Sequence, residues 1–371
     1  MLSKMKLYEK QVNISAYQII IILLICRFQS FMISIYLRDV LEVKNSNIFI
    51  SMLISLIFSL IVFLPALFLI KKFKYANIID ISQKIFPKIG KLISLIFSIY
   101  FLLMAIAHIT NTDFFMMSYV YVDSAPLLVI GIVAVAIYAL FLGIESIFRS
   151  GTIMFTIFTV INFIIILLLI STYNTQNFGP FILSDQKSII NDSSTLAFCP
   201  ELVAMLILCE YCQDKTLFVF NIFQICSFIF EVILMLTIIL CLGYYTNSNI
   251  FPLYIISSVI EIPLFERSEA FYIVIDTLLS VIKTSIYLFL STKCISPFIN
   301  QKYYKFSIVI IGSISFITSM FLIYNIQALK SLIEFVNSPL VILFLIVLIP
   351  LILIISDKIK NSLILQKTVK N

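Results

Sequence analysis

The sequence predicts an all-α, polytopic membrane protein with ten transmembrane helices, and three observations support this fold class. Hydrophobic residues make up 61% of the 371 residues, charged residues make up only 12%, and the mean hydropathy is +1.12. The apolar residues form segments of roughly 20 residues, the length that a helix needs to cross about 30 Å of hydrocarbon. They do not form the alternating ten-residue segments of a membrane barrel. This composition excludes an ordinary soluble domain.

The first apolar segment, residues 14–36, follows Lys4, Lys6 and Lys10 and superficially resembles a secretory signal. It is too long for a signal and lacks a small-residue cleavage site, so we interpret it as a retained first span. Charged residues separate the segments that follow. The ten predicted spans are 14–36, 47–70, 91–112, 125–143, 152–171, 194–211, 217–243, 268–291, 307–325 and 338–356.

An even number of spans puts both termini on one side of the membrane, and the positive charges indicate which side. If the termini are cytoplasmic, eighteen of the 25 Lys and Arg residues lie in inner segments, five lie outside, and Arg27 and Lys283 lie within spans. The positive-inside rule therefore predicts cytoplasmic N- and C-terminal tails on a single integral membrane domain over residues 1–371. The same topology explains the net charge of +6, so we expect no nucleic-acid partner.

Three connections between spans are longer than a turn. The inner segment 75–90 has isoleucines at helical spacing, which predicts a short amphipathic helix on the cytoplasmic surface that stops near Pro87. The outer loop 172–192 is polar and is expected to be a flexible cover. The outer segment 244–267 contains FPLYIISSVIEI, which is apolar but too short to cross the membrane. An ordinary interfacial helix and a gating helix remain equal alternatives for it.

Polar residues interrupt spans 1 and 6. Span 6 contains Phe198, Cys199, Pro200 and Glu201. Its proline frees a backbone carbonyl, and its carboxylate requires a protein-lined or wet cavity. Span 1 contains the polar stretch 27–30. Two interrupted spans of opposite direction, five apart, match an inverted five-plus-five repeat, in which half-helix ends face a small substrate, commonly an amino acid. The repeats would cover about 14–171 and about 194–356.

Counting residues from the membrane faces puts four charged side chains at one depth. Arg27 lies about 20 Å and Glu201 about 18 Å from the inner face, and Glu231 and Asp276 come out at similar heights. An unpaired charge in hydrocarbon costs at least ~2.5–3.5 kcal/mol, so we expect these side chains to face one another or water. We predict that Arg27 pairs with Glu201 and that Asp276 or Glu231 completes a polar chamber. A buried structural ion pair without ligand contact is the alternative. The predicted substrate-binding residues are Arg27, Gln29, Ser30, Phe198, Cys199, Glu201 and Asp276.

Other polar residues have alternative interpretations. Lys283, seven residues after Asp276 on the same face of span 8, either stands where other transporters hold a cation or snorkels toward the cytoplasm. His108, near the outer end of span 3, is either a packing residue or a proton carrier. Cys209 and Cys212 form a CxxC pair with no second pair or histidine nearby, so we expect no metal centre or other cofactor. No nucleotide loop, nucleophile–base set or zinc motif is present, so we expect no enzymatic activity.

Several sequence strings occur together in a recognisable order. They are GIESIFR at 143–149, FCPEL at 198–202, FPLY at 251–254 and FERSEA at 265–270, the last followed by the VIKTSIYLF run through Lys283. With these strings the chain resembles the spore germination permeases, the B subunits of nutrient germinant receptors, from residue 14 to about residue 358. That family in turn resembles the amino acid–polyamine–organocation transporters.

The resemblance implies a ten-helix, permease-like subunit of the inner spore membrane. Such a subunit senses a small nutrient germinant, such as an amino acid, and acts with an A subunit and a lipoprotein C subunit. By position, Glu145 and Arg149 would brace helix ends in the short inner loop after span 4, and Glu266, Arg267 and Glu269 would start span 8 at the outer surface. The residues expected to have gating or structural roles are Glu145, Arg149, Glu266, Arg267, Glu269, His108, Pro200, Glu231 and Lys283.

Span 1 departs from the family pattern. Family members usually place small glycines, and often a proline, at its break, whereas this chain reads CRFQSFMISIY there. Arg27 would either contact a substrate carboxylate with its planar fork or fill the pocket. The second case suits a subunit that binds an unusual germinant or none. Three functions remain as alternatives: a germinant receptor, a proton-coupled amino-acid transporter with Glu201 or Asp276 as carrier, and a component of an ion-conducting channel.

Overall fold

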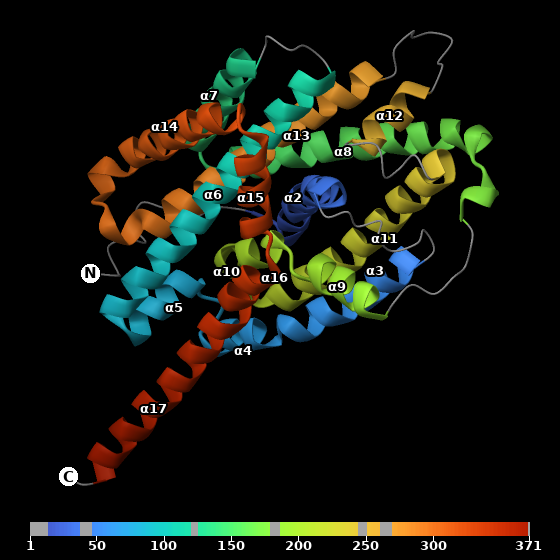
Figure 1. Ribbon diagram of the computed structural model, residues 1–371. Helices are drawn as coiled ribbons and strands as arrows, with labels where there is room; N and C mark the ends of the chain where they lie inside the picture. The colour runs from blue at the N-terminus through green and yellow to red at the C-terminus, as the bar shows by residue number, and fades with distance from the viewer. Residues whose placement is uncertain are drawn as a thin grey trace.

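The computed structural model describes the backbone of residues 14–37, 47–119, 125–178, 186–243, 251–259 and 269–369, and these residues contain helices and turns but no strand (Figure 1). The α-helices are α2 (Ala16–Leu37), α3 (Asn47–Val62), α4 (Leu64–Lys72), α5 (Ile78–Ile85), α6 (Pro87–Tyr119), α7 (Ala125–Leu142), α8 (Ile144–Leu169), α9 (Gln186–Ala197), α10 (Pro200–Cys212), α11 (Thr216–Leu242), α12 (Pro252–Val259), α13 (Glu269–Ile295), α14 (Tyr304–Leu322), α15 (Ile326–Val336), α16 (Pro339–Leu343) and α17 (Ile349–Val369). A π-helical turn, Phe344–Leu348, joins α16 to α17. The predicted all-α class is confirmed.

Eight helical segments within the described residues are long and apolar enough to cross a membrane. They are Asn47–Lys72, Pro87–Tyr119, Ile144–Thr172, Gln186–Cys212, Thr216–Leu242, Glu269–Phe298, Tyr304–Leu322 and Ile326–Lys360. Two shorter apolar stretches, Ala16–Ser30 and Leu127–Leu142, are also helical. The chain is therefore a multi-pass membrane protein, whereas the count of ten spans and the inverted repeat remain predictions.

Span 1 is not interrupted, so that part of the sequence prediction is wrong. The helix α2 is continuous from Ala16 to Leu37 and passes through the polar stretch 27–30. It contains neither glycine nor proline, so every residue keeps an N–H for the helix ladder and none has the conformational freedom of glycine. The polar side chains leave the backbone helical because neighbouring helices supply their partners, as described below.

Span 6 is interrupted, as predicted. The helix α9 ends at Ala197, residues 198 and 199 leave the helical conformation, and α10 begins at Pro200. Pro200 has no N–H, so the carbonyl of Leu196, four residues earlier, cannot receive its usual helical bond. The break therefore exposes a carbonyl that needs another donor.

Two of the three long connections contain the helices that the sequence predicts, and the third differs. The helix α5 ends just before Pro87, and its buried isoleucines pack on α6. The helix α12 lies within FPLYIISSVIEI. The outer segment 172–192 is not simply a flexible loop, because α9 begins at Gln186 and continues the broken span outward. The polar residues of α9 hid this helix from the hydropathy pattern.

The helix α2 lies at the centre of the bundle, in contact with α8, α10, α11 and α13 (Figure 1). The helix α13 packs along α6, and α3 packs against α9. The spans differ in how much of them other helices cover. In the most apolar window of Gln186–Cys212, 83% of the residues are buried, whereas in that of Ile144–Thr172 only 11% are buried. The broken span is therefore enclosed by protein, whereas α8 presents most of its surface outward. In Figure 1, α17 extends away from the other helices toward the C-terminus.

Candidate functional site

Arg27 on α2 joins three helices. Its Nε donates to Glu231 Oε1 on α11 at 2.5 Å, and its Nη2 lies 3.4 Å from Glu231 Oε2. The same Nη2 donates to the carbonyl oxygen of Leu196 at 2.9 Å. This is the carbonyl that Pro200 leaves without its helical donor. Arg27 therefore connects α2 both to α11 and to the end of the outer half of the broken span.

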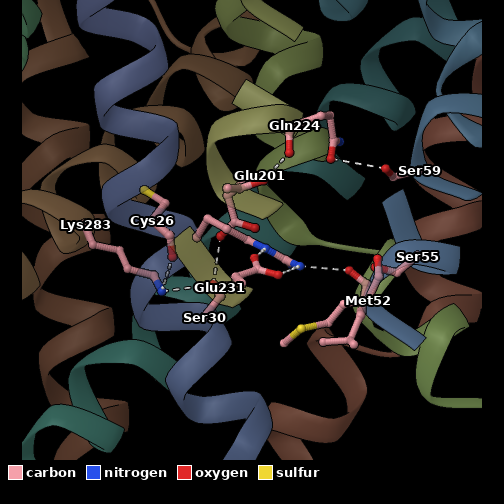
Figure 2. A network of polar contacts seen from close by, with 12 residues as sticks. Cys26, Ser30, Met52, Ser55, Ser59, Glu201, Gln224, Glu231 and Lys283 are labelled. Atoms are coloured by element: carbon pink, nitrogen blue, oxygen red, sulfur yellow. Dashed lines mark hydrogen bonds and ion pairs between the residues drawn. The ribbon is translucent and has the colours of Figure 1, made fainter. Parts of the chain in front are cut away.

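A second chain of contacts leads from the inner half of the broken span to α13. Ser30 Oγ on α2 donates to Glu201 Oε1 in the first turn of α10 at 2.8 Å. Lys283 Nζ on α13 donates to Ser30 Oγ and to the carbonyl oxygen of Cys26, each at 3.0 Å. Figure 2 shows Lys283 directed toward Cys26 and Ser30, with Glu201 and Glu231 close by. Lys283 is 1% exposed, so it does not snorkel toward the cytoplasm.

The predicted pairing of Arg27 with Glu201 is wrong, since Arg27 pairs with Glu231 and Glu201 bonds to Ser30. Counting residues along a span gives the depth of a side chain but not the direction in which it points. Arg27 and Ser30 are three residues apart and so lie side by side on α2. Arg27 contacts α11 and Ser30 contacts α10, and the packing of the helices decides which neighbour each side chain reaches. Arg27 and Glu231 do face each other as an ion pair, whereas the shared depth of the four charges in the membrane remains a prediction.

Gln29 and Asp276 form a third contact beside this network. Gln29 Nε2 on α2 donates to the carbonyl oxygen of Asp276 at 3.2 Å and lies 3.5 Å from Asp276 Oδ1. The side chain of Asp276 is partly exposed and lines a pocket between α2, α8 and α13. Three predicted binding residues on α2 thus contact three different helices: Ser30 contacts α10, Arg27 contacts α11 and Gln29 contacts α13. Phe198 and Cys199 are buried at the break itself.

His108 on α6 lies in a polar contact with α13. Its Nε2 is 3.0 Å from Ser280 Oγ, and Thr112 Oγ1 is 2.6 Å from the same hydroxyl. Sequence reasoning missed Asp113, a fully buried carboxylate one residue further along α6, whose two oxygens have no hydrogen-bond partner among the described residues. The predicted span ended at residue 112, but α6 continues to Tyr119. The apolar residues FFMM after Asp113 were the signal that the helix goes on.

A separate polar cluster lies at the opposite end of α10, which the predicted topology places on the inner side of the membrane, and it is here called the inner clamp. It consists of Asn77, Glu210, Tyr211 and Lys293. Lys293 on α13 forms an ion pair with Glu210, and Asn77, the N-cap of α5, donates to the same carboxylate. Lys293 Nζ also donates to Tyr211 OH at 2.7 Å and lies 4.5 Å from the centre of that ring. In the sequence, Glu210 and Lys293 only mark the ends of predicted spans. No local sequence pattern indicates that the two form a pair.

The remaining predicted residues lie elsewhere. Glu145 and Arg149 form an exposed pair one turn apart at the start of α8, with 3.6 Å between Arg149 Nη2 and Glu145 Oε2. Glu269 is the first residue of α13. Glu266 and Arg267 lie outside the residues that the structure describes.

The network can couple ligand binding to movement of the broken span. Arg27 contacts the last turn of α9, and Ser30 contacts the first turn of α10. The backbone ladder does not cross the break, so these side-chain contacts help to set the relative position of the two halves. A ligand group that competes for one of them would favour a different arrangement.

A bundle of apolar helices, with one broken span and buried charges at the break, defines the class of multi-pass, permease-like membrane proteins. The model of the family described as spore germination protein matches residues 13–328. The match covers more than half of the chain, and the protein therefore belongs to the spore germination permease family. The resemblance in the sequence is confirmed. A search of curated proteins gave no match.

Proposed function

We propose that the protein is the B-type subunit of a nutrient germinant receptor. It is a ten-span subunit of the inner spore membrane with an inverted five-plus-five repeat and both termini in the cytoplasm. It senses a small nutrient such as an amino acid and triggers germination together with A and C subunits, without enzymatic activity of its own. Family membership supports a role in germination. The observation that carries the sensing role is the broken span, whose two halves are held by side chains of α2.

Signalling in this proposal is a shift between two arrangements of α9 and α10. The germinant binds one arrangement more tightly and so increases its population. Arg27 holds the free carbonyl of Leu196 on α9, and Ser30 holds Glu201 on α10. Exchange of one such hydrogen bond for a bond to the ligand moves one half relative to the other. The partner subunits read this movement.

The test is nutrient-triggered germination of spores in which this chain is the B subunit of the receptor. Germination is followed as the fall in optical density after nutrients are added. We expect Ser30→Ala to raise the half-maximal nutrient concentration at least about tenfold, because it removes the hydroxyl between Lys283 and Glu201. The matched control is Ser315→Ala, since the buried Ser315 hydroxyl bonds, among the described residues, within its own helix to the carbonyl of Gly312. An unchanged response of Ser30→Ala at equal protein amount would contradict the proposal.

Transport is the second candidate, and the polar face of α13 favours it. Asp276, Ser280, Lys283 and Ser291 lie along one side of this helix, and polar residues within spans often follow ion or substrate paths. Uptake of radiolabelled amino acids into proteoliposomes separates the candidates. Accumulation by this chain alone would contradict the pure receptor. Ion flux that appears only with partner subunits would favour a channel component.

A further inference from the structure

A group of lysines lies where two membrane-spanning segments end. The segment Asn47–Lys72 ends with α4, and the segment Ile326–Lys360 ends within α17. Lys72 Nζ pairs with Asp357 Oδ2 at 2.5 Å, so both ends lie at the same membrane surface. The helix α5 lies beside them (Figure 1), and Lys360 Nζ donates to the carbonyl oxygen of Ile85, the last residue of α5, at 3.3 Å. This group, here called the lysine patch, consists of Lys71, Lys72, Lys74, Lys84, Lys358 and Lys360.

The charges of the lysine patch are not balanced. Two carboxylates belong to the same three helices, Asp80 on α5 and Asp357 on α17. Asp357 pairs with Lys72, and Asp80 accepts a hydrogen bond from Asn77 Nδ2 at 3.3 Å. The carbonyl end of α4 carries about half a negative charge, which a single lysine offsets. The lysines that are exposed and form no ion pair with any described residue are Lys71, Lys74, Lys84 and Lys358.

Contacts from three helices hold part of the patch in place. Lys72 Nζ and Lys84 Nζ lie 5.9 Å and 5.8 Å from the centre of the Phe73 ring, within the distance of a cation–π interaction. Asp357 also holds Lys72, and the Ile85 carbonyl holds Lys360. These three ammonium groups, from α4, α5 and α17, are therefore arranged by tertiary contacts and are not only neighbours in the sequence.

The turn after α4 keeps a lysine at a position that favours glycine. Lys74 and Tyr75 have φ of 55° and 63°, in the left-handed region. The N–H of Lys74 donates to the carbonyl of Lys71, and that of Tyr75 donates to the carbonyl of Ile70, which is the hydrogen-bond pattern of a Schellman motif. Glycine is the usual residue at the Lys74 position. Strain of this kind persists where the residue serves another purpose, and here it retains a further cation.

Exposed apolar side chains continue from the lysine patch along both spans. Leu64 and Phe68 are 57% and 56% exposed. They precede Lys72 at intervals of four residues, so all three lie on one face of α4. The helix α17 packs against α4, and its exposed apolar residues beside the patch are Ile352, Ile355 and Ile359. An apolar surface that ends in cations matches a phospholipid with a negative headgroup, whereas free phosphate would use only the lysines.

We propose that the lysine patch binds the headgroup of an anionic phospholipid, with its acyl chains along the exposed apolar faces of α4 and α17. Clusters of four to eight lysines next to a span attract anionic lipids. A zwitterionic headgroup carries its own cation and gains less from these lysines. The bound lipid contacts α4, α5 and α17 together and so stabilises their packing. The site lies apart from the broken span and does not depend on whether the protein is a receptor or a transporter.

Three probes test the proposal on the purified full-length protein in a non-ionic detergent. They are dioctanoylphosphatidylglycerol, dioctanoylphosphatidylcholine and inorganic phosphate. Binding is measured by isothermal titration and by the shift of the unfolding temperature. We expect saturable binding of the phosphatidylglycerol, at least about tenfold weaker binding of the phosphatidylcholine, and no stabilisation by phosphate at the same concentration. Raising the salt concentration from about 0.05 M to about 0.5 M should weaken the binding of the anionic lipid, because these charges are exposed.

Paired substitutions locate the site. Lys84→Gln with Lys358→Gln should weaken phosphatidylglycerol binding by about tenfold or more, since each lysine near a membrane surface contributes about fivefold. Lys84→Arg with Lys358→Arg keeps both charges and should keep the affinity. The matched control is Lys302→Gln with Lys305→Gln, which removes two exposed lysines at the start of α14, outside the patch. It should bind the lipid as the unmodified protein does.

Stability without lipid keeps these results interpretable. The Lys84→Gln, Lys358→Gln variant should unfold at the temperature of the unmodified protein, because neither lysine forms an ion pair with a described residue. Lost lipid binding then cannot be attributed to misfolding. Equal binding of the two lipids, or equal weakening in the control, would overturn the proposal. Equal stabilisation by phosphate would show a site for free anions and would also overturn it. So would absence of lipid binding, which would leave the patch to membrane topology or to an acidic partner segment.

Discussion

The two ends of α10 each carry a buried or half-buried carboxylate, and the two are held differently. At the inner end, Glu210 forms a direct ion pair with Lys293 and accepts a hydrogen bond from Asn77. At the outer end, Glu201 reaches Lys283 only through the hydroxyl of Ser30. The inner end is thus closed by opposite charges, whereas the outer end depends on one exchangeable hydroxyl. Under the proposed function, the outer end is the part that a ligand would reorganise.

Burial adds to this contrast. Glu201 is 0% and Lys283 is 1% exposed, whereas the side chains of Glu210 and Lys293 are 21% and 13% exposed. Water can compensate for lost contacts at the inner end but not at the outer end. Substitutions in the outer network should therefore cost more stability than those in the inner clamp, and the following predictions test that order.

Arg27→Met should have the largest effect. It leaves Glu231 buried without its cation and should lower the free energy of unfolding by about 3–5 kcal/mol. The measurement is thermal or denaturant unfolding of the purified protein in detergent. The double variant Arg27→Met with Glu231→Leu removes both charges and should recover most of the loss. A loss below about 1 kcal/mol in the single variant would show that the ion pair is not a main support of the outer network.

Ser30→Ala should have the next largest effect. Its hydroxyl serves two charged groups, Lys283 and Glu201, so we expect a loss of about 2–3 kcal/mol in the same unfolding measurement. Ser315→Ala is the control. Within the part of the chain that the structure describes, that hydroxyl bonds to the carbonyl of Gly312 alone, so the substitution should cost less than about 1 kcal/mol. Equal losses in the two variants would remove the special role given to Ser30.

Glu210→Gln should cost less, about 1–2 kcal/mol, because the inner clamp is partly solvated. A double-mutant cycle with Lys293→Gln measures the coupling between the two charges. We expect the double variant to lose less than the sum of the single losses, since the two side chains act as a pair. A loss larger than that of Arg27→Met would reverse the ranking of the two ends of α10.

Lys330→Gln gives the baseline for an exposed pair. Lys330 and Glu334 lie one turn apart on α15 with 4.0 Å between Nζ and Oε1, and both side chains are about half exposed. The loss in the same unfolding measurement should be at most about 0.5 kcal/mol. A larger loss would indicate that the detergent strengthens interactions between exposed charges. The losses measured for the other variants would then have to be corrected by the same amount.

The interrupted span shows how much of the site could be predicted. Pro200 cannot donate a helical bond, and the chain leaves the helical conformation just before it. Pro350 lacks the same N–H, yet the chain stays helical there after a π-helical turn, so a proline indicates a break or a local distortion and does not by itself decide between them. The polar stretch 27–30 looked similar in the sequence, yet α2 is continuous there. Polar side chains do not prevent a helix when partners are supplied, and a single sequence does not show which partners are present. Asp113 was missed for a related reason, because its charge resembled the end of a span.

The sequence by itself determined the all-α membrane class and indicated the position of the break. These follow from hydrophobic length and from the missing N–H of proline. Only the tertiary structure decided that Arg27 pairs with Glu231, that Ser30 joins Glu201 to Lys283, and that Asp276 lies beside a pocket. These outcomes depend on how each helix is rotated about its axis and which neighbour it meets. Packing between segments far apart in the chain sets both.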